Sequence, residues 1–228
     1  MARDEEQTFL FADLAGFVAL TEVHGDDFAA DAAADFCAGV RQLLPECFAE
    51  EVKTIGDSVM VRVPDADDAI CLAVRIISEV GRRHGALAVR VGVHTGAAVR
   101  RHGDWFGATV NLAARISAVA GCDEVLVSEA TLRQAGTVDG ITIRERGRRS
   151  LRNVAEPVLL FEVLVETERS TRGLPIDPVC RMAVDPKNAA GSLQHSGVTY
   201  YFCSLPCVHS FAEQPDRYTS DAGSRHRG

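Results

Sequence analysis

The order of apolar and polar residues along the chain predicts a mixture of strands and helices. The apolar run from Thr8 to Ala12 predicts a central strand that ends at Asp13. Residues Val59 to Val63 alternate in polarity, and Gly56-Asp57 before them is typical of a hairpin turn between two strands. Further strands are predicted at 88–94, 125–127, 141–143 and 158–165.

Apolar residues at helical spacing predict the helices. The longest stretch runs from Asp26 to Phe48, and a second covers Asp65 to His84. Shorter helices are expected from about Phe17, over 107–120 and over 128–134. Because strands and helices follow one another without strict alternation, we expect an α+β fold of the ferredoxin-like or palm type. Its helices would pack on one face of a mainly antiparallel sheet.

Length and charge narrow the classes of protein that the chain can belong to. Its 228 residues are enough for one medium domain and a small one. The net charge of −8 argues against a nucleic-acid-binding protein, which needs a basic face. No apolar run approaches the ~20 residues of a membrane span, and the N-terminus lacks the apolar core of a signal peptide. We therefore expect a cytoplasmic protein with neither a nucleic acid nor a membrane as partner.

The composition changes near residue 170, which predicts two domains. All three tyrosines and five of the eight prolines lie beyond residue 174. Three of the seven cysteines, Cys180, Cys203 and Cys207, also cluster there, whereas the other four are scattered. We expect a first domain over 1–166, a polar linker over 167–173 and a second domain over 174–228.

Three separated stretches carry the residues on which catalysis could depend. They are 9–17 around Asp13, 53–57 around Gly56-Asp57, and 104–115, which includes Asp104, Asn111 and Arg115. Taken alone, Asp13 is read as an acidic cap of the following helix, and a Gly-Asp turn only reverses the chain. In this order and spacing, however, the three stretches resemble the catalytic domain of the class III nucleotidyl cyclases, over roughly residues 6–166.

The resemblance implies a site for two divalent metal ions. Asp13 and Asp57, at the ends of neighbouring strands, would hold two Mg²⁺ or Mn²⁺ ions about 3.5–4 Å apart. The turn Leu14-Ala15-Gly16-Phe17 would bind phosphate through backbone N–H groups at a helix N-terminus. In this family, the ribose 3′-hydroxyl of the nucleotide attacks its own α-phosphate and pyrophosphate leaves.

The resemblance also assigns four residues that would contact the nucleotide. Asn111 would orient the ribose and Arg115 would stabilise charge on the α-phosphate, although two polar residues four apart are more often a solvated helix face. Lys53 and Asp104 match the positions that read the purine base, although each could be an ordinary surface charge. Lysine can donate to a ring nitrogen of adenine and aspartate can accept from its amino group, so the pair implies ATP as substrate.

In the family, these residues serve sites that two chains share. The metal carboxylates come from one protomer, and the base-reading pair, Asn111 and Arg115 come from the other. A single chain with the complete set therefore implies a head-to-tail homodimer with two equivalent sites.

The sequence departs from relatives at two phosphate-binding positions. Some relatives carry a basic residue after the H-x-G of the fourth strand, where this chain has Ala97. A late lysine-glycine of relatives is replaced by Arg152-Asn153, and Arg152 could keep the charge. The segment from Gly96 to Asp104 is short, so any dimer arm built there is reduced.

The C-terminal segment resembles the YHS domain, which is related to the TRASH-type metal modules. The resemblance rests on 177–182 and 200–207, although relatives usually have glycine where Arg181 stands. Cys180, Cys203 and Cys207 could bind Zn²⁺ or Cu⁺, with Asp177, His195 or His209 as a fourth ligand. The alternative is that the three cysteines pack in a small core.

Together, these features predict an adenylate cyclase with a metal-binding C-terminal domain. The alternative is a non-catalytic nucleotide-binding module whose output is metal binding by the tail. The presence of all six residues of the site favours the enzyme, because a decayed site should have lost at least one. A diguanylate-type cyclase on a similar fold would carry a Gly-Gly-acidic signature, which this chain lacks.

Overall fold

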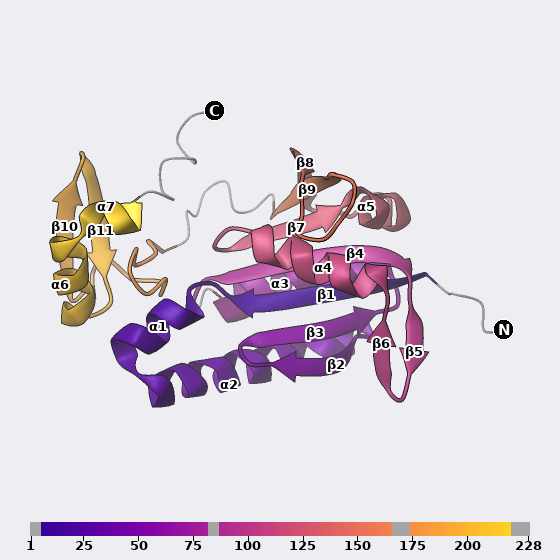
Figure 1. Ribbon diagram of the computed structural model, residues 1–228, viewed down its shortest axis with the longest axis horizontal. Coiled ribbons are helices and arrows are strands. Elements are labelled where there is room, and N and C mark those ends of the chain that lie inside the picture. The colour runs from indigo at the N-terminus through magenta and orange to yellow at the C-terminus, as the bar shows by residue number, and fades with distance from the viewer. Residues whose placement is uncertain (1–5, 82–86, 166–173, 220–228) are drawn as a thin grey trace.

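The computed structural model describes residues 6–81, 87–165 and 174–219. The N-terminal part is built on a seven-stranded sheet with the strand order β2-β3-β1-β4-β7-β9-β8 (Figure 1). Its strands are β1 (Glu6–Leu14), β2 (Glu50–Ile55), β3 (Ser58–Val63), β4 (Val89–Ala97), β7 (Glu124–Ser128), β8 (Ile141–Arg149) and β9 (Val158–Val165). The predicted α+β fold class is therefore confirmed.

Strand β1 lies inside the sheet, with a neighbouring strand on each side. β1 pairs antiparallel with β3 on one side and with β4 on the other, so that Asp13 lies opposite both Ser58 and Arg90. The β4–β7 pair is parallel, and the other neighbouring pairs are antiparallel. The sheet is thus mixed, with the two strands that flank the Gly56-Asp57 turn at one edge.

Helices cover both faces of the sheet, whereas the sequence pattern suggested one. Alternate residues of a strand point to opposite faces. Leu10 and Ala12 belong to the core that includes residues of α2 (Asp26–Leu43) and α3 (Ala66–Arg75), while Phe9 and Phe11 pack with residues of α4 (Ala108–Val119). In Figure 1, α4 crosses the side of the sheet that faces the viewer. Asp13 has the same strand parity as Phe9 and Phe11, so it belongs to the α4 face.

Two glycines of β4 allow α4 to lie close to the sheet. A Cβ added at Gly92 would stand 2.1 Å from the Ser117 backbone nitrogen, which leaves no room for any side chain. A Cβ at Gly96 would stand 2.9 Å from the Thr109 hydroxyl oxygen. That hydroxyl also donates to the Ala97 carbonyl oxygen over 2.5 Å. The backbone of α4 is therefore held at a fixed depth against β4.

The long helices end earlier than the apolar pattern predicted. The run expected to reach Phe48 gives way after Leu43 to a 3-10 turn (Leu44–Cys47), because Pro45 has no backbone N–H to donate. The run expected over 65–84 changes at Ile76 into a π-helical segment (Ile76–Gly81), and residues 82–84 lie outside the described part. Among the helices of the described residues, none is long and apolar enough to cross a lipid bilayer.

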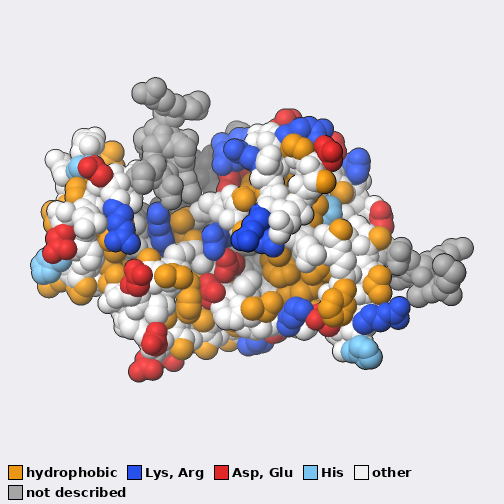
Figure 2. All heavy atoms as spheres, viewed as in Figure 1, with side chains coloured by type: hydrophobic (Ala, Val, Ile, Leu, Met, Phe, Trp, Pro, Cys, Tyr) orange, Lys and Arg blue, Asp and Glu red, His pale blue; other side chains and the backbone are white. Residues whose placement is uncertain are grey.

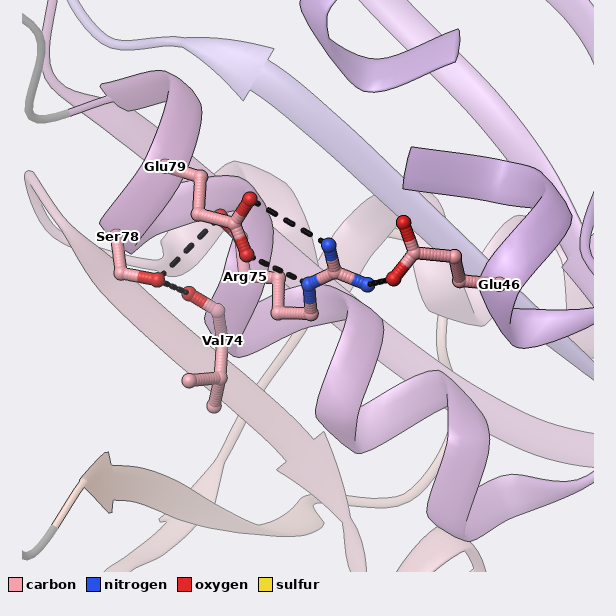
Figure 3. A network of polar contacts seen from close by, with 5 residues as sticks. All are labelled: Glu46, Val74, Arg75, Ser78 and Glu79. Atoms are coloured by element: carbon pink, nitrogen blue, oxygen red, sulfur yellow. Dashed lines mark hydrogen bonds and ion pairs between the residues drawn. The ribbon is translucent and has the colours of Figure 1, made fainter. Parts of the chain in front are cut away.

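A polar network marks the junction between α3 and the π segment (Figure 3). The Arg75 guanidinium contacts Glu46 of the 3-10 turn over 2.7 Å and Glu79 over 2.6 Å. The Ser78 hydroxyl donates to the Val74 carbonyl oxygen over 3.0 Å. Hydroxyl donation to a carbonyl four residues earlier is common where a helix departs from regular geometry. The network ties the end of α3 to the end of the α2 region, on the face opposite α4.

The short segment between β4 and α4 forms a small hairpin of β5 (Val99–Arg101) and β6 (Asp104–Phe106). It extends from one end of the sheet in Figure 1. The hairpin agrees with the expectation of a reduced arm, and it carries Asp104 at the start of its second strand. The short helix α5 (Glu129–Ala135) follows β7 as the sequence predicted.

The C-terminal part is a small unit of β10 (Gly191–His195), β11 (Val198–Phe202), α6 (Leu205–Glu213) and α7 (Pro215–Thr219). Phe202 and Phe211 form its centre, with ring centroids 5.2 Å apart. The unit lies beside α1 (Phe17–His24) in Figure 1. Its residue Met182 forms a β-bridge with Leu87, and the Ala88 N–H donates to the Arg181 carbonyl oxygen. The linker expected over 167–173 lies outside the described residues.

Candidate active site

Two carboxylates meet where β1 ends and the β2–β3 hairpin turns. Asp57 lies in the turn directly before Ser58, the register partner of Asp13. Burial and the adjacent negative charge of Asp13 raise the pKa of Asp57 to about 6. When two partly buried carboxylates lie close together, it is unfavourable for both to be ionised, and a bound cation stabilises the ionised pair. The residues present therefore fit the oxygen-preferring divalent ions implied by the motifs.

A residue that the motifs did not point to faces this pair. The Arg90 guanidinium lies 2.5 Å from the Asp13 carboxylate, across the β1–β4 register. Its Nε is buried and has no hydrogen-bond partner among the described residues. Arg90 thus supplies part of the positive charge that the carboxylates require.

Lys53 and Asp104 come together although 51 residues separate them in the chain. The Lys53 ammonium contacts the Asp104 carboxylate over 2.6 Å, linking β2 to β6. This hydrogen bond lowers the pKa of Asp104, and the Trp105 backbone N–H adds a second donor to the carboxylate. Both charged side chains remain partly accessible, at 38 % and 32 %. The pair is therefore assembled within one chain and can still be reached by a ligand.

Asn111 and Arg115 lie one helical turn apart on α4, so they share a face of that helix. Asn111 is exposed and Arg115 is half-buried. On the opposite side of α4, Val110 and Ala113 pack against Phe9 and Phe11. The helix is therefore anchored by its apolar side and presents its two polar residues outward.

The turn Leu14–Phe17 has the geometry expected of a strand-to-helix connection. Gly16 adopts a left-handed conformation, with φ of 85°, directly before α1. Its carbonyl accepts from Leu20 N–H, while the Ala15 N–H donates to the Ala88 carbonyl oxygen over 2.7 Å. The Arg181 side chain covers this turn, because a Cβ at Gly16 would stand 2.4 Å from Arg181 Cγ.

Arg152 lies elsewhere. It is exposed in the connection between β8 and β9, at the other side of the sheet from the β2–β3 edge. Ala97 ends β4 and is exposed. The structure therefore does not bring Arg152 together with the Asp13–Asp57 pair within one chain.

Apolar side chains surround the candidate residues on the α4 face. Figure 2 shows hydrophobic side chains gathered over the middle of this face, next to acidic and basic ones. Ile55, two residues after Lys53 on β2, is 58 % exposed, and Phe106, two residues after Asp104 on β6, is 52 % exposed. Exposed apolar surface therefore lies next to the Lys53–Asp104 pair on both β2 and β6.

The three cysteines of the C-terminal part lie together, and His24 of α1 joins them. The ligand atoms of His24, Cys180, Cys203 and Cys207 all lie within 4.8 Å of one another. Cys203 Sγ is 3.3 Å from Cys180 Sγ, 3.8 Å from Cys207 Sγ and 3.7 Å from His24 Nε2. Such a Cys/His cluster can hold a metal ion.

The three residues proposed from the sequence as a fourth ligand have other positions. The buried Asp177 carboxylate accepts from Val179 N–H over 2.8 Å and from Cys203 N–H over 2.9 Å, so it fixes the backbone around the cysteines. His195 Nε2 lies 3.2 Å from Asp216, and His209 is exposed on α6. His24 was missed because no local pattern links a helix-end histidine to cysteines 150 or more residues later in the chain.

Comparison with known proteins agrees with this geometry. The family model of the adenylate and guanylate cyclase catalytic domain matches residues 1–162, and that of the YHS domain matches residues 176–222. A pH-sensitive adenylate cyclase of Mycobacterium tuberculosis is 35 % identical over 171 residues, which cover 73 % of this chain and 42 % of that protein. An adenylate cyclase of Streptomyces griseus is 35 % identical over 131 residues, covering 58 % of this chain and 33 % of that protein. The chain thus spans less than half the length of these curated relatives.

Solved structures share the fold. An adenylate cyclase structure from Trypanosoma brucei superposes with a TM-score of 0.64 at 25 % identity, covering 81 % of this chain and 96 % of that one. The guanylate cyclase domain from Catenaria anguillulae in complex with GTP gives a TM-score of 0.62 at 18 % identity, covering 71 % and 97 %. The family model covers most of the chain, and the paired carboxylates and the polar face of α4 agree with it. The chain therefore belongs to the class III adenylate and guanylate cyclase catalytic-domain family, with a YHS domain following.

Proposed function

We propose that this protein is an adenylate cyclase that converts ATP to 3′,5′-cyclic AMP and pyrophosphate. The ribose 3′-oxygen forms a bond to the α-phosphorus, the bond from that phosphorus to the bridging oxygen of pyrophosphate breaks, and the 3′-hydroxyl proton leaves to solvent. The observation that carries the proposal is the Lys53–Asp104 contact of 2.6 Å, because it joins the two base-reading candidates on one chain.

The base-reading pair supports ATP over GTP. Lys53 presents an ammonium donor and Asp104 a carboxylate acceptor, which match N1 and the exocyclic amino group of adenine. Guanine offers a carbonyl oxygen and a protonated ring nitrogen at the same edge, which reverses this pattern. Because a mispaired polar group in a closed site is costly, the pair can discriminate strongly. Both curated relatives described above are named adenylate cyclases.

Asp13 and Asp57 would hold the divalent ions, Mg²⁺ or Mn²⁺. When bound, these ions supply positive charge to the phosphates and favour the ionised form of the attacking hydroxyl. Arg90, in contact with Asp13, limits how far the carboxylate can move from the strand end. The turn Leu14–Phe17 follows directly and leads into the N-terminus of α1, where backbone N–H groups can face phosphate oxygens.

The α4 residues act on the reacting centre. Asn111 would hold the ribose so that its 3′-oxygen is aligned with the phosphorus, and the Arg115 guanidinium would contact the α-phosphate oxygens as charge builds there. α4 is fixed by its apolar side against β1 and β4, so both groups are positioned before the substrate arrives.

Two chains would complete each site. The exposed Ile55 and Phe106 flank Lys53 and Asp104, so a second copy that covers the α4 face would also enclose the nucleotide. In this head-to-tail homodimer, one chain supplies Asp13 and Asp57 and its partner supplies Lys53, Asp104, Asn111 and Arg115. Arg152, exposed between β8 and β9, would reach phosphate only across that interface.

The test is to incubate the purified chain with Mn²⁺ and either ATP or GTP, and to identify products by mass spectrometry. We expect cyclic AMP and pyrophosphate in equal amounts, and a much lower rate with GTP. Nucleotide binding without product would favour a non-catalytic nucleotide-binding module, and equal rates with both nucleotides would contradict the roles of Lys53 and Asp104.

A further inference from the structure

The C-terminal domain contacts the short helix α1 at both of its ends. At the N-terminal end, the Arg181 side chain lies over Gly16 of the turn, with its Cγ 2.4 Å from where a Gly16 Cβ would stand. At the C-terminal end, His24 Nε2 lies 3.7 Å from Cys203 Sγ. Helix α1 has eight residues and is therefore about 12 Å long.

The distances from Cys203 Sγ to the other three donor atoms are close to those of a tetrahedral metal site. Around a Zn²⁺ ion with Zn–S of ~2.3 Å and Zn–N of ~2.0–2.1 Å, two sulfurs are about 3.8 Å apart and a sulfur and a nitrogen about 3.5 Å apart. The corresponding distances from Cys203 are 3.8 Å to Cys207 Sγ and 3.7 Å to His24 Nε2. The Cys180–Cys203 distance of 3.3 Å is shorter by only a few tenths of an ångström.

The surroundings hold these donors in place. Cys180 and Cys207 are buried, and Cys203 and His24 are half-buried. The Asp177 carboxylate fixes the backbone N–H groups next to Cys180 and at Cys203. On the other side, the His24 ring packs against Phe28, with ring centroids 5.0 Å apart, and α1 ends at His24 with Gly25 as its C-cap. The imidazole is thus oriented by the catalytic domain and the thiols by the C-terminal domain.

We propose that His24, Cys180, Cys203 and Cys207 form a Zn²⁺ site that is complete only when the two domains are docked. The ion clamps the C-terminal domain onto α1, so its occupancy restrains the turn at Leu14–Phe17. The last step rests on the proposed function, because that turn is assigned there to the phosphates. Cys180 and Arg181 are consecutive, so the same loop supplies a ligand and covers Gly16.

Titration of the full chain tests the site without any nucleotide. Reduced, metal-free protein would be titrated with Co²⁺ and then with Zn²⁺. We expect one Co²⁺ per chain with the intense near-ultraviolet absorption of cobalt–thiolate bonds, displaced by Zn²⁺. Cys203→Ser and Cys207→Ser together should abolish this absorption, whereas Co²⁺ held only by carboxylates gives none.

The decisive variant is His24→Ala. It should weaken Zn²⁺ binding by about 100-fold. Removing a residue that only hydrogen-bonds to a metal ligand already weakens binding by about 10- to 100-fold, and His24 is proposed as a ligand itself. His24→Cys restores a ligand and should restore binding with an altered cobalt spectrum. His209→Ala, an exposed histidine two residues from Cys207, is the matched control and should bind as the wild type does. Unchanged Zn²⁺ affinity in His24→Ala would overturn the proposal.

Hydrogen exchange tests the docking of the C-terminal domain onto α1 independently of cyclase activity. Zn²⁺ should slow amide exchange in α1 as well as in the C-terminal domain of the wild type, and only in the latter for His24→Ala. Protection confined to the C-terminal domain of the wild type would contradict a clamp between domains. These readouts do not involve nucleotide, so a protein that binds Zn²⁺ as described but makes no cyclic AMP refutes the proposed function alone.

Discussion

Lys53 and Asp57 lie four residues apart around one hairpin, yet their side chains take part in different groups of residues. Lys53 contacts Asp104 of β6 over 2.6 Å, whereas Asp57 faces Asp13 at the end of β1. In a shared-site dimer, the two residues therefore act in different active sites, even though mutations at both fall within one short segment.

Mixing experiments follow from this separation. Asp57→Ala and Arg115→Ala should each be nearly inactive as homodimers, but random reassociation of equal amounts should restore about a quarter of wild-type activity. Half of the dimers are then mixed, and each of those has one intact site out of two. Activity of the co-refolded mixture measures the effect.

Mixing inactive variants also shows to which half of the shared site Lys53 belongs. Lys53→Glu should regain activity when mixed with Asp57→Ala and should stay inactive with Arg115→Ala, because Lys53 and Arg115 belong to the same half of the site. Asp13→Ala mixed with Asp57→Ala is the matched control and should also stay inactive. Restored activity in that control, or none in any mixture, would show that the sites are not shared in this way.

Base selection gives the second prediction. Lys53→Glu should reduce the rate with ATP by two orders of magnitude or more while leaving the melting temperature nearly unchanged, because a partly exposed ion pair contributes only about 0–1 kcal/mol to stability. Arg41→Glu breaks the similar contact of 2.6 Å with Glu51 on the same strand and serves as control. Replacing Asp104 as well should narrow the preference for ATP over GTP, measured as the ratio of kcat/KM values.

The close approach of α4 to β4 gives the third prediction. Gly92→Ala should destabilise the protein by about 3 kcal/mol, because its Cβ would meet backbone atoms of Ser117 that cannot move independently of α4. Gly96→Ala should cost about 1 kcal/mol, because its Cβ meets the Thr109 hydroxyl, a side-chain atom. Denaturant unfolding measures both values, and equal costs would contradict this account of the packing. Any folded Gly92→Ala protein should lose activity through displacement of Asn111 and Arg115.

The half-buried His94 makes stability depend on pH. Burial lowers the pKa of His94 from its ordinary value of 6.5 to about 4, and its Nδ1 lies 2.7 Å from the Ser128 hydroxyl. In the unfolded chain, His94 therefore becomes protonated below about pH 6.5, whereas in the folded chain it is protonated only below about pH 4. The contribution of His94 to stability is complete above pH 6.5 and falls as the pH decreases toward 4, by about 2 kcal/mol between pH 7 and pH 5. His94→Gln should flatten this part of the pH profile, whereas the exposed control His209→Gln should not.

The sequence predicted the parts of the fold and site that depend on local pattern. Asp13 follows an apolar strand and Asp57 lies in a Gly-Asp turn, so each could be located from its own neighbours. The contact between Lys53 and Asp104 spans 51 residues and could be expected only from the family resemblance. The predicted roles of these residues stay predictions until activity is measured.

The rest depends on tertiary contacts that local pattern does not encode. Arg90 meets Asp13 because of the β1–β4 register, and α4 takes the second face of the sheet because Gly92 leaves room for it. His24 is 179 residues from Cys203, in the other domain. In such cases, both partners look ordinary in the sequence, and only the packing of distant elements brings them together.

The position of β1 inside the sheet also affects how the chain can fold during synthesis. β1 is made before both of its neighbours, and the second of them, β4, ends at Ala97, about 80 residues later. At ~5–20 residues per second, the ribosome takes roughly 4 to 17 seconds to cover that interval. Throughout it, the apolar segment Phe9–Ala12 has at least one unpaired edge. The emerging chain therefore exposes a strand that invites intermolecular pairing, and we expect its yield on expression to depend on temperature and on chaperones that bind nascent chains.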